Sequence, residues 1–262
     1  MIDTHVHLDD DKLRGEVAAV VERAHSAGVL NMISIATSYG SARQCVQLAQ
    51  SFSGVFASVG IHPNYGQEAQ PRDWEGVVKL VDEPRVVALG ETGLDRYWDN
   101  TPFPLQQDYF SRHLELSRKT GLPVVIHCRE ADGDMLKMLK QEYELQGPIL
   151  GVMHSFSGSP TFGDACLEMG LYLSFSGVVT YKNADKLRSY AAQVPADRIL
   201  VETDAPYLTP VPLRGVIKKN EPAHVMHTAQ CVADTRGISL QELDALTTGN
   251  AKRLFSRMNE AR

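Results

Sequence analysis

Histidine and carboxylate residues recur at one kind of position in this sequence, directly after short apolar segments. Five of the nine histidines lie at such positions, and so do a glutamate and an aspartate. These residues are His5, His7, His62, His127, His154, Glu91 and Asp204. Imidazole nitrogens and carboxylate oxygens are ligands for zinc, manganese and magnesium in proteins. The pattern therefore favours a metal centre that is assembled from distant parts of the chain.

His5 and His7 are separated by one residue, which on an extended chain places both side chains on the same face. Two such imidazoles can hold one cation, each nitrogen lying about 2.0–2.1 Å from it. The pair is weak support by itself, because a core histidine beside a solvated one has the same spacing. The histidines and carboxylates that follow later apolar segments strengthen the metal interpretation.

The candidate ligands outnumber the four that a single tetrahedral ion needs. Two metals about 3.5–4 Å apart would use them economically. Glu91 is the candidate bridge, because a carboxylate has two oxygens to share, and Asp204 could bind one ion and accept the proton of the attacking water. The alternative for both carboxylates is helix capping or a buried ion pair. Glu202, on the same face of the chain as Asp204, either orients a histidine ligand or forms a structural ion pair.

Other polar and aromatic residues follow the same apolar segments. His62 either donates a hydrogen bond to a phosphate or leaving group or holds its own turn before Pro63. Arg129 either pairs with a phosphate oxygen or with Glu130 or Asp132. Aromatic residues could stack on the bases of a single strand or only wall a pocket; they are Tyr65, Tyr97, Trp98, Phe103, Phe156 and Tyr207. We expect the other four histidines to be structural: His25, His113, His224 and His227.

The elements that position these residues alternate between two kinds. Eight short apolar segments, at residues 1–2, 29–36, 55–61, 86–89, 124–126, 149–153, 171–175 and 199–201, are typical of strands in a parallel sheet. Helical periodicity is evident between them, for example at 12–27, 105–120, 134–144 and 183–193. Eight βα units predict a (β/α)8 TIM barrel, whose active site lies at the C-terminal ends of the strands; a doubly wound sheet is the alternative. We expect residues 222–236, 239–246 and 248–258 to form closing helices, and residues 1–262 to form a single domain.

Composition and charge exclude several classes. The 262 residues contain 26 Lys and Arg against 32 Asp and Glu, a formal net charge of -6, so there is no basic surface for tracking long nucleic acids. The four cysteines form no C-x-x-C pair, which argues against a disulfide framework or a cysteine-based zinc site. No apolar run approaches 18 residues and no signal-peptide pattern is present, so we expect a cytoplasmic protein without a membrane span.

Five segments together resemble the TatD family of metal-dependent hydrolases, in order from residue 1 to about 255. They are His5-Val6-His7, Gly90-Glu91-Thr92-Gly93-Leu94-Asp95, Pro123-Val124-Val125-Ile126-His127-Cys128-Arg129, His154-Ser155-Phe156-Ser157-Gly158 and Glu202-Thr203-Asp204-Ala205-Pro206-Tyr207-Leu208. The resemblance implies a TIM barrel of the amidohydrolase-like superfamily with a two-metal site. It places one metal on His5, His7, Glu91 and Asp204, and the other on Glu91, His127 and His154.

The resemblance also implies a cofactor and an activity. The cofactor would be two divalent ions per chain, Mg2+, Mn2+ or Zn2+, and several family members are deoxyribonucleases, including 3′-to-5′ exonucleases. Two departures are visible. Thr92 replaces the usual isoleucine, and the segment from Arg214 to Pro222 is two residues longer than usual, which leaves open how Arg214 meets a substrate.

The expected reaction is hydrolysis of a phosphodiester, in single-stranded DNA or at a DNA end, by a metal-bound hydroxide with Asp204 as general base. Bound cations would offset the acidic charge where a phosphate sits, so the net charge does not exclude this substrate. The alternative is an amide, lactone or carboxylic ester, such as an aminoacyl ester on tRNA, at the same binuclear site. A non-catalytic metal scaffold is disfavoured, because structural sites close their coordination with fewer ligands. No obligatory protein partner is indicated.

Overall fold

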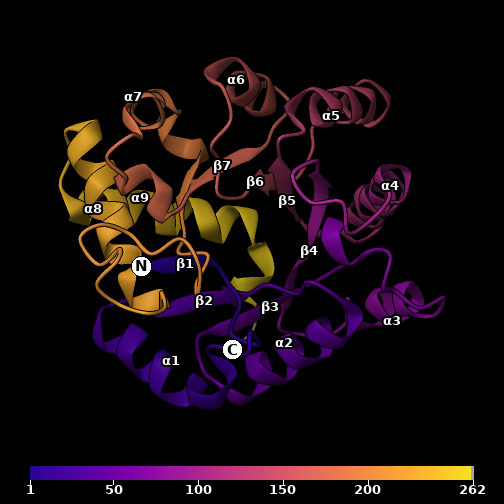
Figure 1. Cartoon of the computed structure of the whole chain (residues 1–262), viewed down its shortest axis with the longest axis horizontal. Coiled ribbons are helices and arrows are strands. Elements are labelled where there is room, and N and C mark those ends of the chain that lie inside the picture. Colours follow the sequence, from indigo (N-terminus) through magenta and orange to yellow (C-terminus); the bar gives the residue numbers. More distant parts are fainter. Residues whose placement is uncertain (261–262) are drawn as a thin grey trace.

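Eight parallel strands form a barrel in the computed structural model, which describes residues 1–260 (Figure 1). The strands are β1 (Ile2–Val6), β2 (Asn31–Ser34), β3 (Val55–Val59), β4 (Val86–Asp95), β5 (Val124–Arg129), β6 (Gly151–Met153), β7 (Tyr172–Phe175) and β8 (Ile199–Val201). Each strand pairs with the next in chain order. Beyond β8 the chain returns to β1, where Val6 pairs with Ala205 and the His7 N–H donates to the Ala205 carbonyl at 2.8 Å. The TIM-barrel prediction is confirmed, and the doubly wound alternative is wrong.

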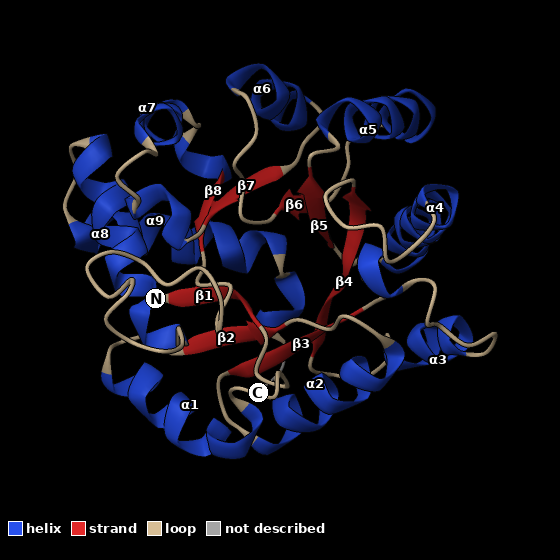
Figure 2. Cartoon of the chain, viewed as in Figure 1, coloured by secondary structure: helices blue, strands red, loops and turns tan. Residues whose placement is uncertain are grey.

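Helices surround this barrel (Figure 2). They are α1 (Val17–Ser26), α2 (Tyr39–Ser51), α3 (Asp73–Leu80), α4 (Phe103–Thr120), α5 (Asp132–Gln146), α6 (Pro160–Glu168), α7 (Asp185–Gln193), α8 (Val225–Arg236) and α9 (Leu240–Leu254). Local sequence explains their ends: α4 stops at Gly121, whose φ of 70° suits glycine, and Ser239 caps α9 in a capping box with Glu242. No helix within residues 1–260 has the length and apolarity needed to cross a membrane.

The C-terminal segment closes one end of the barrel. Leu254, Phe255 and Met258 share a buried apolar cluster with strand residues that include Ile2 and Phe56. Figure 1 shows this yellow segment lying across the barrel. The closing helices are therefore confirmed, and the end at which the strands finish stays free for a site.

The boundary expected within these closing helices is wrong. Residues 239–246 and 248–258 were predicted as two helices, but α9 runs without a break to Leu254 and a 3-10 helix (Ser256–Asn259) follows. The two threonines at the expected break lie within α9, where Thr247 donates to the Leu243 carbonyl at 2.9 Å and Thr248 to Asp244 Oδ1 at 2.9 Å.

Strand β4 is longer than its apolar segment at 86–89 predicts, and it carries Glu91 within the sheet. The sequence Gly-Glu-Thr-Gly has the composition of a turn, so it was expected to follow the strand. Gly93 permits the continuation: its φ is 141°, and a Cβ there would lie 2.0 Å from the His127 carbonyl oxygen. Glycine thus allows β4 and β5 to run side by side up to the site.

His113 on α4 packs behind this part of β4 and is fully buried. Its Nε2 accepts the Ile61 N–H at 3.2 Å, and its Nδ1 donates to the Tyr109 carbonyl at 2.6 Å. The edge of the Trp74 indole packs against the ring. Burial lowers the pKa of His113 to about 4, so the imidazole is neutral and structural.

This histidine makes the stability of the fold depend on pH. Below about pH 6.5 the unfolded chain binds a proton at His113, whereas the folded chain does so only near pH 4. The contribution of His113 to the free energy of unfolding should therefore fall by about 2 kcal/mol between pH 7 and pH 5. Urea unfolding of the parent and of His113→Asn at both pH values measures the difference. The variant should lose about 2 kcal/mol less than the parent on acidification; equal losses would contradict this role.

Candidate active site

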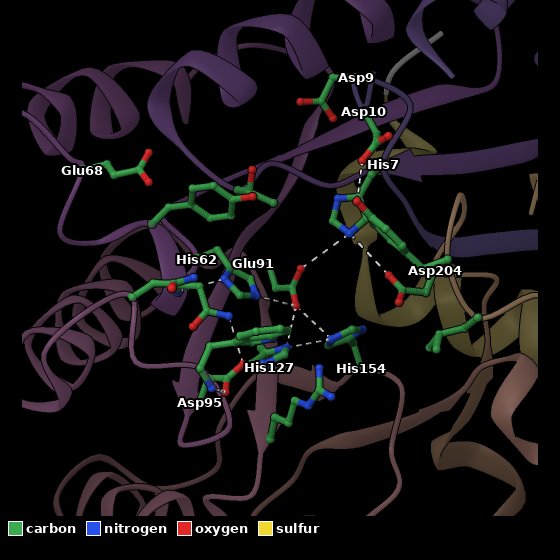
Figure 3. Close-up of a pocket in the computed structure, with 18 residues that line it drawn as sticks. His7, Asp9, Asp10, His62, Glu68, Glu91, Asp95, His127, His154 and Asp204 are labelled. Carbon is green, nitrogen blue, oxygen red and sulfur yellow. Dashed lines mark hydrogen bonds and ion pairs between the residues drawn. The ribbon is translucent and has the colours of Figure 1, made fainter. Parts of the chain in front are cut away.

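A cavity of about 800 Å³ opens where the C-terminal ends of the strands meet (Figure 3). Most of the residues predicted for the site line it, namely His7, His62, Glu91, His127, Arg129, His154, Asp204 and Tyr207. His5 is fully buried beside them, with its ring stacked on that of His154 at 4.0 Å. Arg214 does not line the cavity; its guanidinium stacks on Tyr181 at 3.7 Å.

Glu91 occupies the centre of this arrangement, and its two oxygens face different histidines (Figure 3). Oε2 lies 3.4 Å from Nε2 of His5 and 3.8 Å from Nε2 of His7. Oε1 lies 2.8 Å from Nε2 of His154 and 3.0 Å from Nδ1 of His127. One carboxylate on β4 therefore touches two separate groups of nitrogen donors.

The first donor group consists of His5 in β1, His7 directly after β1, and Asp204 after β8. The two Nε2 atoms are 3.2 Å apart, and Asp204 Oδ1 lies 3.5 Å from His5 and 3.3 Å from His7. Asp204 has a φ of 56°, a left-handed conformation that a short polar side chain tolerates. Its N–H donates to the His5 carbonyl at 2.9 Å, which fixes the carboxylate over the barrel end.

The second donor group combines His127 of β5 with His154, which follows β6. His127 Nδ1 and His154 Nε2 are 3.4 Å apart, on the Oε1 side of Glu91. His62 lies near this group, its Nε2 being 3.5 Å from the same oxygen.

Hydrogen bonds at the far side of three rings turn the other ring nitrogen toward the cavity. His7 donates from Nδ1 to the Ile35 carbonyl at 3.0 Å, and His154 donates from Nδ1 to Glu202 at 3.2 Å. His127 donates from Nε2 to Asp95 at 3.0 Å. Nearby carboxylates raise the pKa of His7 to about 9 and also raise the pKa values of His127 and His154, so a bound metal would displace a proton from each ring. Once that proton has left, a histidine held in this way presents a lone pair to the cavity, as a metal ligand must. His5 differs, because its buried Nδ1 has no partner within residues 1–260 and stacking on His154 holds the ring.

The donor atoms have the spacing that a cation requires. Ligands about 2.0–2.1 Å from a tetrahedral ion lie about 3.3–3.4 Å from one another. The separations run from 3.2 to 3.8 Å in the first group and from 2.8 to 3.4 Å in the second. Imidazoles and carboxylates are also the right chemistry for divalent metals, and the shortest contacts of the second group would lengthen by about 0.5 Å around an ion.

Glu91 and Asp204 are ionised at neutral pH. Burial by itself raises the pKa of Glu91, but His154, His62 and His5 outweigh it and hold that pKa well below the usual range. For Asp204, burial is likewise outweighed by the hydrogen bond and charge of His7, and the pKa is lowered. Two negative charges thus face the cavity, where a cation would bind them.

His62 is arranged as a hydrogen-bond donor. Its Nδ1 accepts the Asn64 N–H at 3.0 Å, so a neutral ring carries its proton on Nε2, which faces the cavity. Burial lowers the pKa of His62, which keeps the ring neutral. The histidine holds its own turn through Nδ1 and can donate to a ligand through Nε2, so the two readings of the sequence are compatible.

Asp95 is a site residue to which the sequence interpretation gave no role of its own. Its Oδ2 accepts from His127 Nε2 and from Asn64 Nδ2, each at 3.0 Å. Its Oδ1 accepts the backbone N–H groups of Tyr97 at 2.8 Å and Trp98 at 3.0 Å. Its position at the end of the Gly-Glu-Thr-Gly-Leu-Asp segment was visible, but its bond to His127 depends on the register of β4 and β5.

The barrel and its centre of histidines and carboxylates define a metal-dependent hydrolase. The family model described as TatD related DNase matches residues 2–256, and the chain belongs to this family. A relative in Bacillus subtilis, the uncharacterized metal-dependent hydrolase YabD, is 36% identical over 97% of this chain and 98% of its own length.

Two further relatives connect the chain to a nuclease and to a solved structure. A Klebsiella pneumoniae protein named 3′-5′ ssDNA/RNA exonuclease TatD is 36% identical, with 97% of each chain covered. The crystal structure of YjjV, a TatD homologue from Escherichia coli, superposes with a TM-score of 0.90 at 29% identity over 98% of each chain. The predicted family and the predicted class, a metal-dependent hydrolase, are therefore confirmed.

Replacing Asp95 by Asn should disturb His127. The amide would place a donor where Oδ2 now accepts, so His127 would carry its proton on Nδ1 and lose the lone pair that faces Glu91. We expect metal affinity to fall about 10- to 100-fold in Asp95→Asn, measured by competition with a chelator. Asp134→Asn is the matched control, because Asp134 pairs with Arg96 outside the cavity. Equal metal affinity of the Asp95 variant and the parent would refute this role.

Proposed function

We propose that the chain hydrolyses phosphodiesters of nucleic acids, with single-stranded DNA attacked from an end, at a site that holds two divalent cations. The observation that carries the proposal is the division of the Glu91 oxygens between two donor groups. The name of the Klebsiella relative, an exonuclease of single-stranded DNA and RNA, supports the choice of substrate.

The metal-holding residues follow from the two donor groups. His5, His7 and Asp204 with Glu91 Oε2 would hold one cation, and His127 and His154 with Glu91 Oε1 the other. When bound, such a pair of cations lowers the pKa of water and neutralises charge on a phosphodiester. Mg2+, Mn2+ and Zn2+ all accept these ligands.

The protein side chains supply the proton transfers and the positioning. Asp204 lines the cavity with an ionised carboxylate, so it can accept the proton of the attacking water. His62 donates from Nε2 to a phosphate oxygen, and Arg129 supplies a positive charge at the cavity wall. Tyr207 also lines the cavity, and its hydroxyl donates to Asp10 at 2.6 Å. Glu202 holds His154 in place.

The acidic net charge is compatible with this substrate. The formal charge of -6 includes Glu91 and Asp204, and two divalent cations would add four positive charges beside them. The positive potential would be confined to the cavity, which favours a strand end over a long duplex.

Asp204→Asn tests the chemistry. Removing the proton acceptor should reduce the rate of nucleotide release about 10²- to 10⁴-fold. The assay uses end-labelled single-stranded DNA with Mg2+ or Mn2+, and excess chelator should abolish the activity of the parent. Asp197→Asn, at an exposed pair with Arg198, is the control and should cleave at the parental rate. An Asp204 variant as active as the parent would remove Asp204 from the mechanism.

A panel of lactones, amides and carboxylic esters, including aminoacyl-tRNA, separates the proposed substrate from the alternative. We expect kcat/KM for single-stranded DNA to exceed that for every member of the panel by at least about tenfold, because His62 and Arg129 suit an anionic phosphate. Turnover of an ester or amide with intact DNA would establish the alternative in place of the nuclease.

A further inference from the structure

The turn after β4 presents an aromatic residue to the cavity. Trp98 lines the cavity with 48% of its surface exposed, a large apolar area for a site built from charged residues. The neighbouring Tyr97 supports it edge-on, with ring centroids 4.8 Å apart. Trp98 therefore offers an exposed aromatic surface at the cavity, beside Tyr97.

Arg129 lies beside this aromatic pair with its charge uncompensated. Its guanidinium stacks over Tyr97 at 3.8 Å and lies 6.0 Å from the Trp98 ring. Within residues 1–260 it forms no salt bridge, and it pairs with neither Glu130 nor Asp132; Arg96 of the same turn is paired with Asp134 at 2.7 Å. A stacked guanidinium keeps its N–H groups available for a phosphate.

Charge on the other wall directs an anionic ligand toward this side. Asp9, Asp10 and Glu68 also line the cavity, and Figure 3 shows Asp9 and Asp10 across Glu91 from Asp95. These carboxylates repel a phosphate chain. Arg129, beside the turn that follows Asp95, is the one Lys or Arg among the described residues that line the cavity, and its charge attracts a phosphate.

The turn is tied to the reactive centre by a single carboxylate. Asp95 accepts the N–H groups of Tyr97 and Trp98 with one oxygen and holds His127 with the other. Asp95 therefore fixes the backbone at Trp98 relative to His127. A base bound at Trp98 would then have a defined position relative to Glu91.

We propose that Trp98 stacks on a base of single-stranded nucleic acid next to the cleaved phosphodiester, and that Arg129 pairs with an adjacent phosphate. This inference rests on the proposed function, because it takes a nucleic acid as the substrate. A paired base in a duplex has no free face for Trp98, so the contact selects unpaired ends. Stacking tolerates any base, and the preference is for strandedness and not for sequence.

Intrinsic fluorescence tests the stacking directly, because the chain has only two tryptophans. Trp74 packs against Tyr109 and His113 on the outside of the barrel, so Trp74→Phe leaves Trp98 as the sole indole. In a Trp74→Phe, Asp204→Asn chain with Mg2+, short single-stranded DNA should quench the emission. An abasic strand of equal length and charge should bind about tenfold more weakly or worse. Equal quenching and affinity with the two strands would overturn the proposal.

Substitution of Trp98 provides a second readout. Trp98→Ala should weaken DNA binding about 5- to 100-fold and Trp98→Phe much less, because a phenyl ring still stacks. Tyr143→Ala is the matched control, an aromatic residue 39% exposed on α5 and away from the cavity. Parental affinity and parental KM in Trp98→Ala would overturn the role of the indole.

Salt dependence isolates Arg129. Arg129→Gln should reduce the slope of log affinity against log salt by about 0.7, the value for one phosphate contact on a single strand, whereas Arg129→Lys should preserve it. Arg112→Gln is the control, since Arg112 also lies over a tyrosine but pairs with Asp108 on α4. An unchanged slope in Arg129→Gln would overturn the phosphate contact.

These outcomes are separate from those of the nuclease assay. Base-dependent quenching, with no DNA cleavage by the parent, would support the contacts proposed for Trp98 and Arg129 and refute the proposed activity. DNA cleavage by Trp98→Ala with a parental KM would support the activity and refute the stacking of Trp98 on a base.

Discussion

The arrangement depends on one buried carboxylate. Glu91 is 3% exposed, and a buried charge is tolerated only where opposite charges or hydrogen bonds compensate it. The barrel supplies that compensation by bringing the ends of β1, β5 and β6 and the segment after β8 around β4. Each Glu91 oxygen therefore lies beside its own group of histidines. The contacts that compensate the buried charge are the same ones that would let two cations share this carboxylate.

A second layer of acceptors gives the donor groups their chemistry. Glu202, Asp95 and the Ile35 carbonyl accept hydrogen bonds at the far sides of three rings, so the opposite nitrogens face the cavity. Asp95 extends this layer outward, because it also holds the turn that carries Trp98. Asp95 therefore connects a proposed metal ligand, His127, to a proposed substrate contact, Trp98.

Sequence periodicity predicted the barrel because strands buried on both faces are apolar throughout, and the candidate ligands stood out because polar residues interrupt that pattern at strand ends. The features that sequence periodicity did not predict depend on contacts between segments that are distant in the chain. The extension of β4 relies on a close approach at Gly93, and the role of Asp95 relies on the register with β5. The sequence left open how Arg214 meets a substrate, and the structure stacks its guanidinium on Tyr181, a contact that no local pattern encodes.

Anomalous diffraction from crystals grown with Mn2+ is the most direct test of the central claim, that Glu91 divides its oxygens between two cations. We expect two anomalous peaks about 3.5–4 Å apart. One should contact Glu91 Oε2 together with His5, His7 and Asp204, and the other Glu91 Oε1 together with His127 and His154. A single peak at saturating Mn2+, or two peaks of which only one touches Glu91, would contradict the account.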